Sequence, residues 1–178
     1  MIDAKAIILK YYKEDSDLFR SLWIHSECVM QKALRCAKHC TLDIDIDFVA
    51  EAALLHDIGI FRCHAPSIHC MGDEPYICHG RIGAELMRAE GYPRHARVCE
   101  RHTGAGLTKH DIISQKLPLP EEDFLPETIE EKVICYADKF YSKTRLNHEK
   151  SFEEALRSLQ KFGEEGVLRF REWKNLFE

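Results

Sequence analysis

The chain has 178 residues, a length that suits one domain with a substantial core. Its hydrophobic fraction of 45% and charged fraction of 31% are ordinary for a soluble globular protein and indicate neither a disordered chain nor a membrane class. The net charge of -5 argues against a nucleic-acid polymer as the main partner, although a small phosphate ligand needs only a local basic pocket.

The first residues lack the long apolar region of a signal peptide, and no run approaches the ~18 apolar residues of a membrane span. We therefore expect a cytoplasmic protein without a membrane partner. The eight cysteines are spread through expected helices of a chain too long to need disulfide stapling, so reduced thiols are expected. Cys36 and Cys40 have no second pair at zinc-finger spacing, which argues against a structural zinc site.

The N-terminal part of the chain is expected to be helical. Residues 3–13 and 17–40 are expected helices, and the second has apolar residues near helical spacing. Asp15 or Ser16 is available as its N-cap. After a polar turn, Asp47 is the expected cap of the helix that follows.

The helical pattern is lost over residues 60–77, where prolines and a glycine mark a long loop, and such loops in compact domains are often functional. A helix over about 79–90 follows and is expected to be closed by Gly91. Pro93 is well placed in the first turn of the next helix, which the turn 103–106 interrupts.

The C-terminal part is also expected to be helical. A short helix near 108–115 leads into an acidic, proline-punctuated loop over 117–123. Capping boxes at 128–131 and 151–154 predict two further helix starts, and the tail to Phe177 is expected to be amphipathic helix. The sequence shows no strand signal, so the predicted fold is all-α with one domain.

Two metal-binding side chains end the apolar run 52–55 of an expected core helix. Such a helix would carry His56 and Asp57 into an interior where an ionised carboxylate costs several kcal/mol unless it is paired or bound to a metal. A metal is the partner that uses both side chains at once. Both can reach one cavity near the helix end before Gly59 turns the chain away.

Four potential ligands lie on three expected helices in the order histidine, histidine-aspartate, aspartate. They are His25, His56, Asp57 and Asp138. This order resembles the HD-domain superfamily of metal-dependent phosphohydrolases, most strongly in Leu-Leu-His-Asp-Ile-Gly over 54–59 and Tyr-Ala-Asp-Lys over 136–139. The resemblance implies a single all-α HD domain over 1–178, with a metal-site core at about 20–142 and a helical extension at 151–178.

Two more histidines, His79 and His102, fall where the dinuclear branch of that superfamily has ligands, and each lies beside glycines that allow close approach. The resemblance implies one metal held by the four residues above, with Asp57 bridging to a second held by His79 and His102. Imidazole and carboxylate ligands without thiolate suit iron, manganese, zinc, nickel or cobalt. The sequence does not choose among these five divalent transition metals.

The implied activity is hydrolysis of a phosphoester or phosphoanhydride of a small phosphorylated metabolite, such as a nucleotide. Two metals would lower the pKa of a bridging water, and the resulting hydroxide would be the nucleophile, with Asp57 as the catalytic ligand that touches both ions. Two alternatives stay open: a di-iron oxygenase, because some HD-domain proteins use similar ligands, and a non-catalytic signalling or binding module. The oligomeric state is also left open.

Departures from known subgroups leave the substrate undefined. The acidic pair of guanosine-tetraphosphate hydrolases is missing after Gly59, and Ile60 stands where cyclic-di-GMP phosphodiesterases have lysine. Four basic residues near the proposed ligands are candidates for binding phosphate oxygens: Arg81, Arg101, Lys109 and Lys139. The turn 103–106 is either a small anion nest or a plain helix C-cap.

Overall fold

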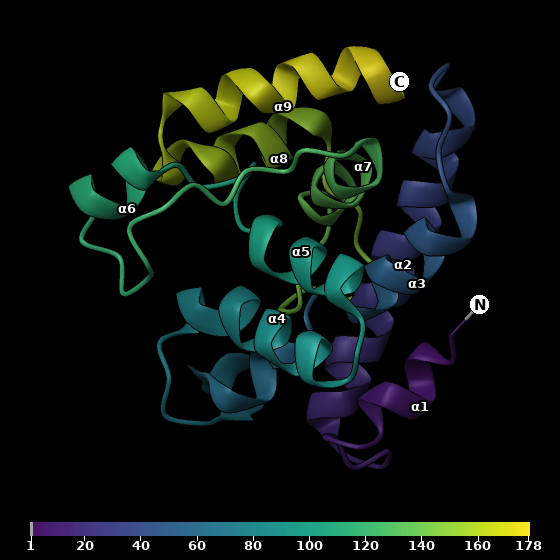
Figure 1. Ribbon diagram of the computed structural model, residues 1–178, viewed down its shortest axis with the longest axis vertical. Helices are drawn as coiled ribbons and strands as arrows, with labels where there is room; N and C mark the ends of the chain where they lie inside the picture. The colour runs from purple at the N-terminus through teal and green to yellow at the C-terminus, as the bar shows by residue number, and fades with distance from the viewer. Residues whose placement is uncertain (1) are drawn as a thin grey trace.

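The computed structural model describes residues 2–178, and most of these are helical (Figure 1). The α-helices are α1 (Ala4–Ile8), α2 (Asp17–His39), α3 (Ile46–Leu55), α4 (His79–Ala89), α5 (Pro93–Arg101), α6 (Lys109–Ser114), α7 (Ile129–Asp138), α8 (Phe152–Leu159) and α9 (Glu164–Phe177). The 3-10 helices are η1 (Ile58–Arg62), η2 (Pro66–Ile68), η3 (Tyr76–Cys78) and η4 (Gln160–Phe162), and the strands are β1 (His64–Ala65) and β2 (Cys70–Met71). Within residues 2–178 no helix is both long and apolar enough to cross a bilayer.

The N-terminal helices differ in detail from the sequence prediction. Ser16 caps α2 by accepting a hydrogen bond from the Phe19 amide. Helix α1 is shorter than the expected 3–13. In the irregular segment that follows it, the Tyr12 hydroxyl donates a hydrogen bond to Ile58 O, 2.7 Å away. Asp45, rather than the expected Asp47, caps α3, and Asp47 lies in the first turn, where its charge complements the helix dipole.

The segment between α3 and α4 is ordered by its own backbone hydrogen bonds. Strands β1 and β2 pair antiparallel, with His64 opposite Met71, which corrects the expectation of no strand. Each strand has two residues, too few for an alternating pattern to be visible in the sequence. The Gly72 amide donates to Cys63 O at 2.9 Å, so the predicted loop is an ordered segment with backbone hydrogen bonds of its own.

Two apolar clusters hold the helices together. In one, α2 and α3 pack with α7 and α9 around Tyr136, Phe170 and Phe177, all fully buried. In the other, α1 and the start of α2 pack with η1, α4 and α5. Figure 1 shows α9 lying across one end of the molecule, with α8 and α7 beneath it and with α5 and α4 below these.

The predicted capping boxes are present at the starts of α7 and α8. The Thr128 and Ser151 side chains accept hydrogen bonds from the backbone amides of Glu131 and Glu154, whose carboxylates accept from the amides of Thr128 and Ser151 in return. A third box, Thr108 with Asp111, starts α6. The tail is not one continuous helix as expected. The left-handed φ of 105° at Gly163 separates α8 and η4 from α9.

Candidate metal centre

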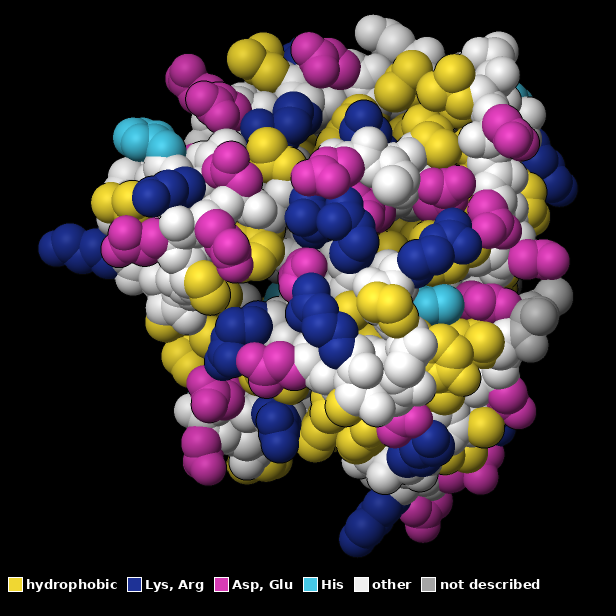
Figure 2. Space-filling view, in the orientation of Figure 1, with side chains coloured by type: hydrophobic (Ala, Val, Ile, Leu, Met, Phe, Trp, Pro, Cys, Tyr) yellow, Lys and Arg dark blue, Asp and Glu magenta, His cyan; other side chains and the backbone are white. Residues whose placement is uncertain are grey.

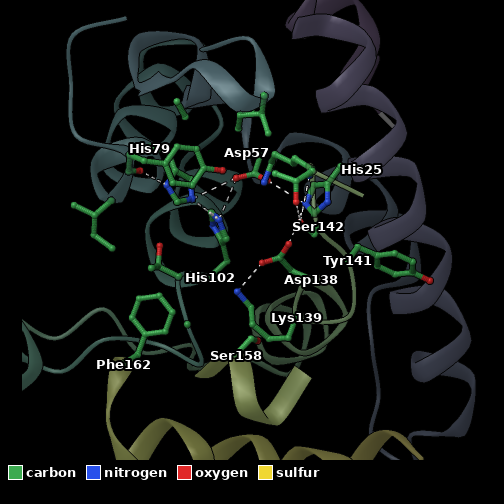
Figure 3. Close-up of a pocket in the computed structure, with 18 of the residues that line it drawn as sticks. His25, Asp57, His79, His102, Asp138, Lys139, Tyr141, Ser142, Ser158 and Phe162 are labelled. Atoms are coloured by element: carbon green, nitrogen blue, oxygen red, sulfur yellow. Dashed lines mark hydrogen bonds and ion pairs between the residues drawn. The ribbon is translucent and has the colours of Figure 1, made fainter. Parts of the chain in front are cut away.

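Five helix segments bring six imidazole and carboxylate side chains to one point (Figure 3). The middle of α2, the end of α3, the start of α4, the end of α5 and the last residue of α7 supply them. They are His25, His56, Asp57, His79, His102 and Asp138. All six are buried, with at most 8% of any residue exposed. The sequence predicted this set, and the structure places its members together.

The first four-residue group surrounds one oxygen of Asp57. The Oδ2 atom lies 2.9 Å from His56 Nε2 and 3.2 Å from His25 Nε2. Asp138 Oδ1 approaches the same two nitrogens, at 3.0 Å from His25 and 3.4 Å from His56. Potential ligand atoms of the group lie within 4.8 Å of one another, which is compatible with one shared cation.

The second group surrounds the other oxygen of Asp57. The Oδ1 atom lies 3.4 Å from His79 Nε2 and 3.3 Å from His102 Nε2, and these two nitrogens are 3.0 Å apart. Asp57 therefore faces one group with each carboxylate oxygen. This is the arrangement that a bridging ligand between two cations requires.

Backbone carbonyls orient three of the imidazoles. The Nδ1 atoms of His56, His79 and His102 lie 2.6–2.7 Å from the carbonyl oxygens of Ala53, Tyr76 and Cys99. A carbonyl can only accept, so each Nδ1 carries a proton, and in the neutral ring each Nε2 presents a lone pair to the centre. Partners of this kind fix the ring orientation and raise the basicity of a metal-binding histidine.

A glycine allows the two groups to meet. A Cβ atom at Gly59 would lie 2.3 Å from His79 O and 2.5 Å from Gly83 N. Any side chain at residue 59 would therefore push α4, and His79 with it, away from Asp57. The glycine of the His-Asp-Ile-Gly motif acts here as a packing residue between η1 and α4.

Burial and neighbouring charges set the protonation states. Burial lowers the pKa of His79 to about 3 and also lowers the pKa of His102. Burial opposes the charge of Asp57, but His56 and Lys143 outweigh it and hold the carboxyl pKa well below its usual range. Burial likewise opposes the charge of His56, yet Asp57 and Asp138 raise its pKa to about 9. His79 and His102 are therefore neutral and able to bind a metal, whereas His56 holds an extra proton that a metal must displace.

The donor set passes a test of fit for a divalent cation. Asp57 Oδ1 and His56 Nε2 are buried without a hydrogen-bond partner of good geometry among residues 2–178. Unsatisfied buried acceptors are costly, and a cation between the two groups would satisfy them. Nitrogen and oxygen donors without thiolate fit first-row transition metals.

A cavity of about 590 Å³ opens from the His/Asp cluster, and its lining includes a residue that sequence analysis missed. Lys143 Nζ lies 2.5 Å from Asp57 Oδ2, and this contact with Asp57 contributes to raising the lysine pKa despite burial. No spacing rule signals Lys143, because it lies in an irregular segment after α7. The Tyr76 ring also stacks on His79, with centroids 4.7 Å apart.

One of the four predicted phosphate-binding residues lines this cavity. Lys139 does so and pairs with Asp138 Oδ2 at 2.7 Å. The other three lie elsewhere: Arg81 pairs with Glu85, Arg101 donates to Leu125 O and pairs with Glu127, and the exposed Lys109 is outside the lining. Figure 2 shows this outer face, with basic and acidic side chains interspersed over α4 and α5. Arg81 and Arg101 are close to His79 and His102 in sequence, but helix periodicity directs their side chains away from the cavity.

The fold and the paired His/Asp groups define a class of helical proteins with two buried groups of side chains that could hold metal ions. The HD domain family model matches residues 22–142, and the chain belongs to this family.

Sequence relatives are longer proteins. The chain is 37% identical over 145 residues to a tRNA (cytidine(56)-2'-O)-methyltransferase of Picrophilus torridus, covering 81% of the chain and 37% of that relative. It is 38% identical over 121 residues to an uncharacterized protein of Methanocaldococcus jannaschii, covering 67% of the chain and 63% of the relative. The chain therefore spans less than two thirds of either relative.

Solved structures share the fold at low sequence identity. The HD domain of the Listeria monocytogenes phosphodiesterase PgpH superposes with a TM-score of 0.55 at 18% identity, covering 98% of this chain and 86% of that one. The same domain in complex with cyclic-di-AMP gives a TM-score of 0.56 at 19% identity, covering 98% and 84%. This likeness extends through α8 and α9, beyond the matched family region.

Proposed function

We propose that the protein is a metal-dependent phosphohydrolase that cleaves a phosphoester or phosphoanhydride of a nucleotide or another small phosphorylated metabolite. The observation that carries the proposal is the placement of Asp57, whose two oxygens face two separate groups of buried ligand-type side chains. Membership in the HD domain family supports the hydrolytic class.

In this proposal His25, His56, Asp57 and Asp138 hold one cation, while Asp57, His79 and His102 hold a second. When bound, the cations would supply an activated water and neutralise charge on the phosphoryl oxygens. Lys143 lies beside Asp57 in the cavity and is placed to neutralise a phosphoryl oxygen as the bond breaks. The carbonyl partners of the imidazoles keep the Nε2 atoms directed at the centre throughout.

The cavity is suited to a substrate of nucleotide size, since ligand pockets of about 300–1,000 Å³ hold small organic molecules. A fold neighbour binds cyclic-di-AMP, which makes cyclic dinucleotides candidates to be tested. Relatives named as tRNA methyltransferases make tRNA a further candidate, although the net charge of -5 favours a small ligand.

The test combines metal content with a substrate screen. Protein purified anaerobically is analysed for metals and assayed for phosphate or nucleotide release from phosphate esters, nucleotides, cyclic dinucleotides and tRNA. We expect bound transition metal and hydrolysis of at least one small phosphate compound, and we expect Asp57→Ala to abolish that hydrolysis. Asp73→Ala, an exposed carboxylate in the loop before α4, is the matched control and should retain it.

Three results would contradict the proposal. Full turnover by Asp57→Ala would show that the paired groups do not carry the reaction. Oxygen consumption with an organophosphonate or polyol, in a protein that releases no phosphate from esters, would indicate a di-iron oxygenase instead. A protein that binds a nucleotide without converting it would be a binding module.

A further inference from the structure

The cavity that opens from the His/Asp cluster has more cationic than anionic side chains in its lining. Four lysines line it: Lys139, Lys143, Lys150 and Lys161. Two carboxylates line it, Asp57 and Asp138, and both belong to the candidate metal groups. The cavity therefore attracts anions even before any metal charge is counted.

The lysines divide into an inner and an outer pair. The inner pair is held by the carboxylates of the centre, Lys143 by Asp57 at 2.5 Å and Lys139 by Asp138 at 2.7 Å. The outer lysines have no such partner: within residues 2–178, neither forms an ion pair with a carboxylate. Lys150 Nζ donates to Lys139 O at 3.2 Å, and Lys161 Nζ lies 4.9 Å from the Phe162 ring centroid.

The outer lysines, Lys150 and Lys161, repel one another, and Lys150 also repels Lys139. Burial lowers the pKa of Lys150, and the nearby charges of Lys139 and Lys161 lower it further, whereas the charges of Asp138 and Glu154 act in the opposite direction. Cations that share a cavity and form no ion pair of their own are stabilised by a bound anion, which offsets their mutual repulsion. A phosphoryl group has enough oxygens to accept from two ammonium groups at once.

Contacts outside the matched family region hold the outer lysines in place. The Phe162 ring lies over Gly104, where a Cβ atom would be 3.2 Å from the ring. Arg169 of α9 donates to the carbonyl oxygens of Ala105 and Gly106 and so ties the C-terminal helices to the same turn. Figure 3 shows Phe162 across the cavity from Asp57, with His102 between them. Lys161, the residue before Phe162 in η4, is therefore placed at the side of the cavity opposite Asp57.

We propose that Lys150 and Lys161 form an outer phosphate subsite, which selects ligands carrying a second phosphoryl group linked to the one that reacts beside Asp57. The inference rests on the proposed function for the identity of the inner position. It gives residues beyond the matched region 22–142, namely Lys150 and Lys161, the role of selecting the substrate. The ligand class is a compound with at least two linked phosphoryl groups, in contrast to a simple phosphate monoester.

The test measures binding of two inorganic probes by calorimetry to the full chain with its metal as purified. Orthophosphate reaches one position only, whereas tripolyphosphate spans the inner and outer positions. Lys150→Met and Lys161→Met remove the outer charges singly and together, and Lys161→Arg restores one. Lys13→Met removes an exposed charge outside the cavity lining and is the matched control. Metal content is assayed after each titration, because tripolyphosphate also binds free metal.

We expect Lys161→Met to weaken tripolyphosphate binding about fivefold, as for an exposed ion pair, and Lys150→Met about tenfold, as for a partly buried one. Orthophosphate binding should change less than about twofold in both, and Lys161→Arg should bind like the parent. Unchanged tripolyphosphate affinity in a folded double variant with full metal content would overturn the outer subsite. An equal loss for orthophosphate would also overturn it.

The outcome is separable from that of the proposed function. If tripolyphosphate binding depends on the outer lysines in a protein that hydrolyses no phosphate compound, the subsite stands and the proposed hydrolase activity falls. If a phosphate compound is hydrolysed while the outer lysines affect neither its KM nor tripolyphosphate binding, the activity stands and the subsite falls.

Discussion

Asp57 connects the two halves of the site at the scale of single residues. Each of its oxygens approaches two histidines, and each set of histidines comes from different helices. A carboxylate that is buried and ionised beside several imidazoles is unfavourable unless a cation compensates it. Because the two groups share only Asp57, His79 and His102 can be substituted while all four residues of the first group are kept.

The double variant His79→Ala/His102→Ala tests this separation. We expect the parent to bind about two transition-metal ions per chain and the double variant about one, because the four-residue group remains complete. The measurement is elemental analysis of protein purified under identical conditions. His64→Ala/His69→Ala, which changes two loop histidines outside both groups, is the control and should bind as much as the parent. Equal metal content in all three proteins would mean that the second position does not exist.

Buried histidines also predict how the stability of the chelated protein depends on pH. Burial lowers the pKa of His79 to about 3, below its unfolded value of about 6.5, so the unfolded chain binds more protons between these values. Stability from this group is therefore lost as pH falls below about 6.5. For His56, burial is outweighed by Asp57 and Asp138, which raise its pKa to about 9, so its contribution is lost as pH rises from about 6.5 to 9.

We expect thermal unfolding in excess chelator to give a maximum stability near pH 6.5, falling on both sides by at most about 1.4 kcal/mol per pH unit for each group. His79→Asn should flatten the acid side and leave the alkaline side unchanged. A stability that rises steadily from pH 6.5 to 9 would contradict these protonation states. Added metal should remove the alkaline decline, since it displaces the proton from His56.

At the scale of elements, the junction of α3, η1 and α4 determines the distance between Asp57 and His79. Gly59 lies against the backbone of α4. Gly80 lies equally close to α5, because a Cβ atom added there would be 2.5 Å from Cys99 O. Three elements thus meet at backbone distance, and glycines are the residues that permit it.

Gly59→Ala should destabilise the protein by about 3 kcal/mol or more, because the added methyl meets backbone atoms that cannot rotate aside. Metal content should fall with it. The control is Gly166→Ala in α9, where the nearest heavy atoms would be 3.8 Å or more away and helix propensity favours alanine. Chemical denaturation of both variants measures the difference. Equal stability of Gly59→Ala and the parent would show that α4 can move without cost.

At the scale of the whole molecule, the C-terminal helices share a core with the metal-binding helices. The Phe170 ring of α9 lies 4.8 Å from the Tyr136 ring of α7, and Phe152 of α8 stacks on Phe170 at 5.3 Å. Tyr136 is two residues from Asp138, so packing of α9 bears on the position of a candidate ligand. We therefore place residues 151–178 in the same domain as the matched region.

Phe170→Ala should lower the free energy of unfolding by about 3–5 kcal/mol, the usual cost of removing a fully buried aromatic side chain. Unfolding should remain one cooperative transition, because the core is shared. Leu168→Ala, on the same helix with 60% of the residue exposed, should change stability by less than about 0.5 kcal/mol. Two separate transitions in the parent would contradict a single core.

The sequence by itself determined the helical class, the two capping boxes of α7 and α8, and the six side chains that meet at the centre. Helix periodicity and capping are local properties, so the residues that express them are visible in the chain. The six side chains were recognisable because the order of histidines and aspartates resembles a pattern of the HD-domain family, to which the match over residues 22–142 assigns the chain. Their roles as ligands remain a proposal until metal is measured.

Only the tertiary structure decided which lysine and arginine side chains line the cavity. Lys143, Lys150 and Lys161 come from irregular segments or a helix end after α7, where no period predicts the direction of a side chain, whereas Arg81 and Arg101 adjoin the ligands in sequence but point to the outer face. Contacts between distant segments, such as Phe162 with Gly104 and Lys143 with Asp57, fix these directions. A side chain's neighbours in space depend on the packing of whole helices, and packing is a property of the folded chain rather than of any stretch of it.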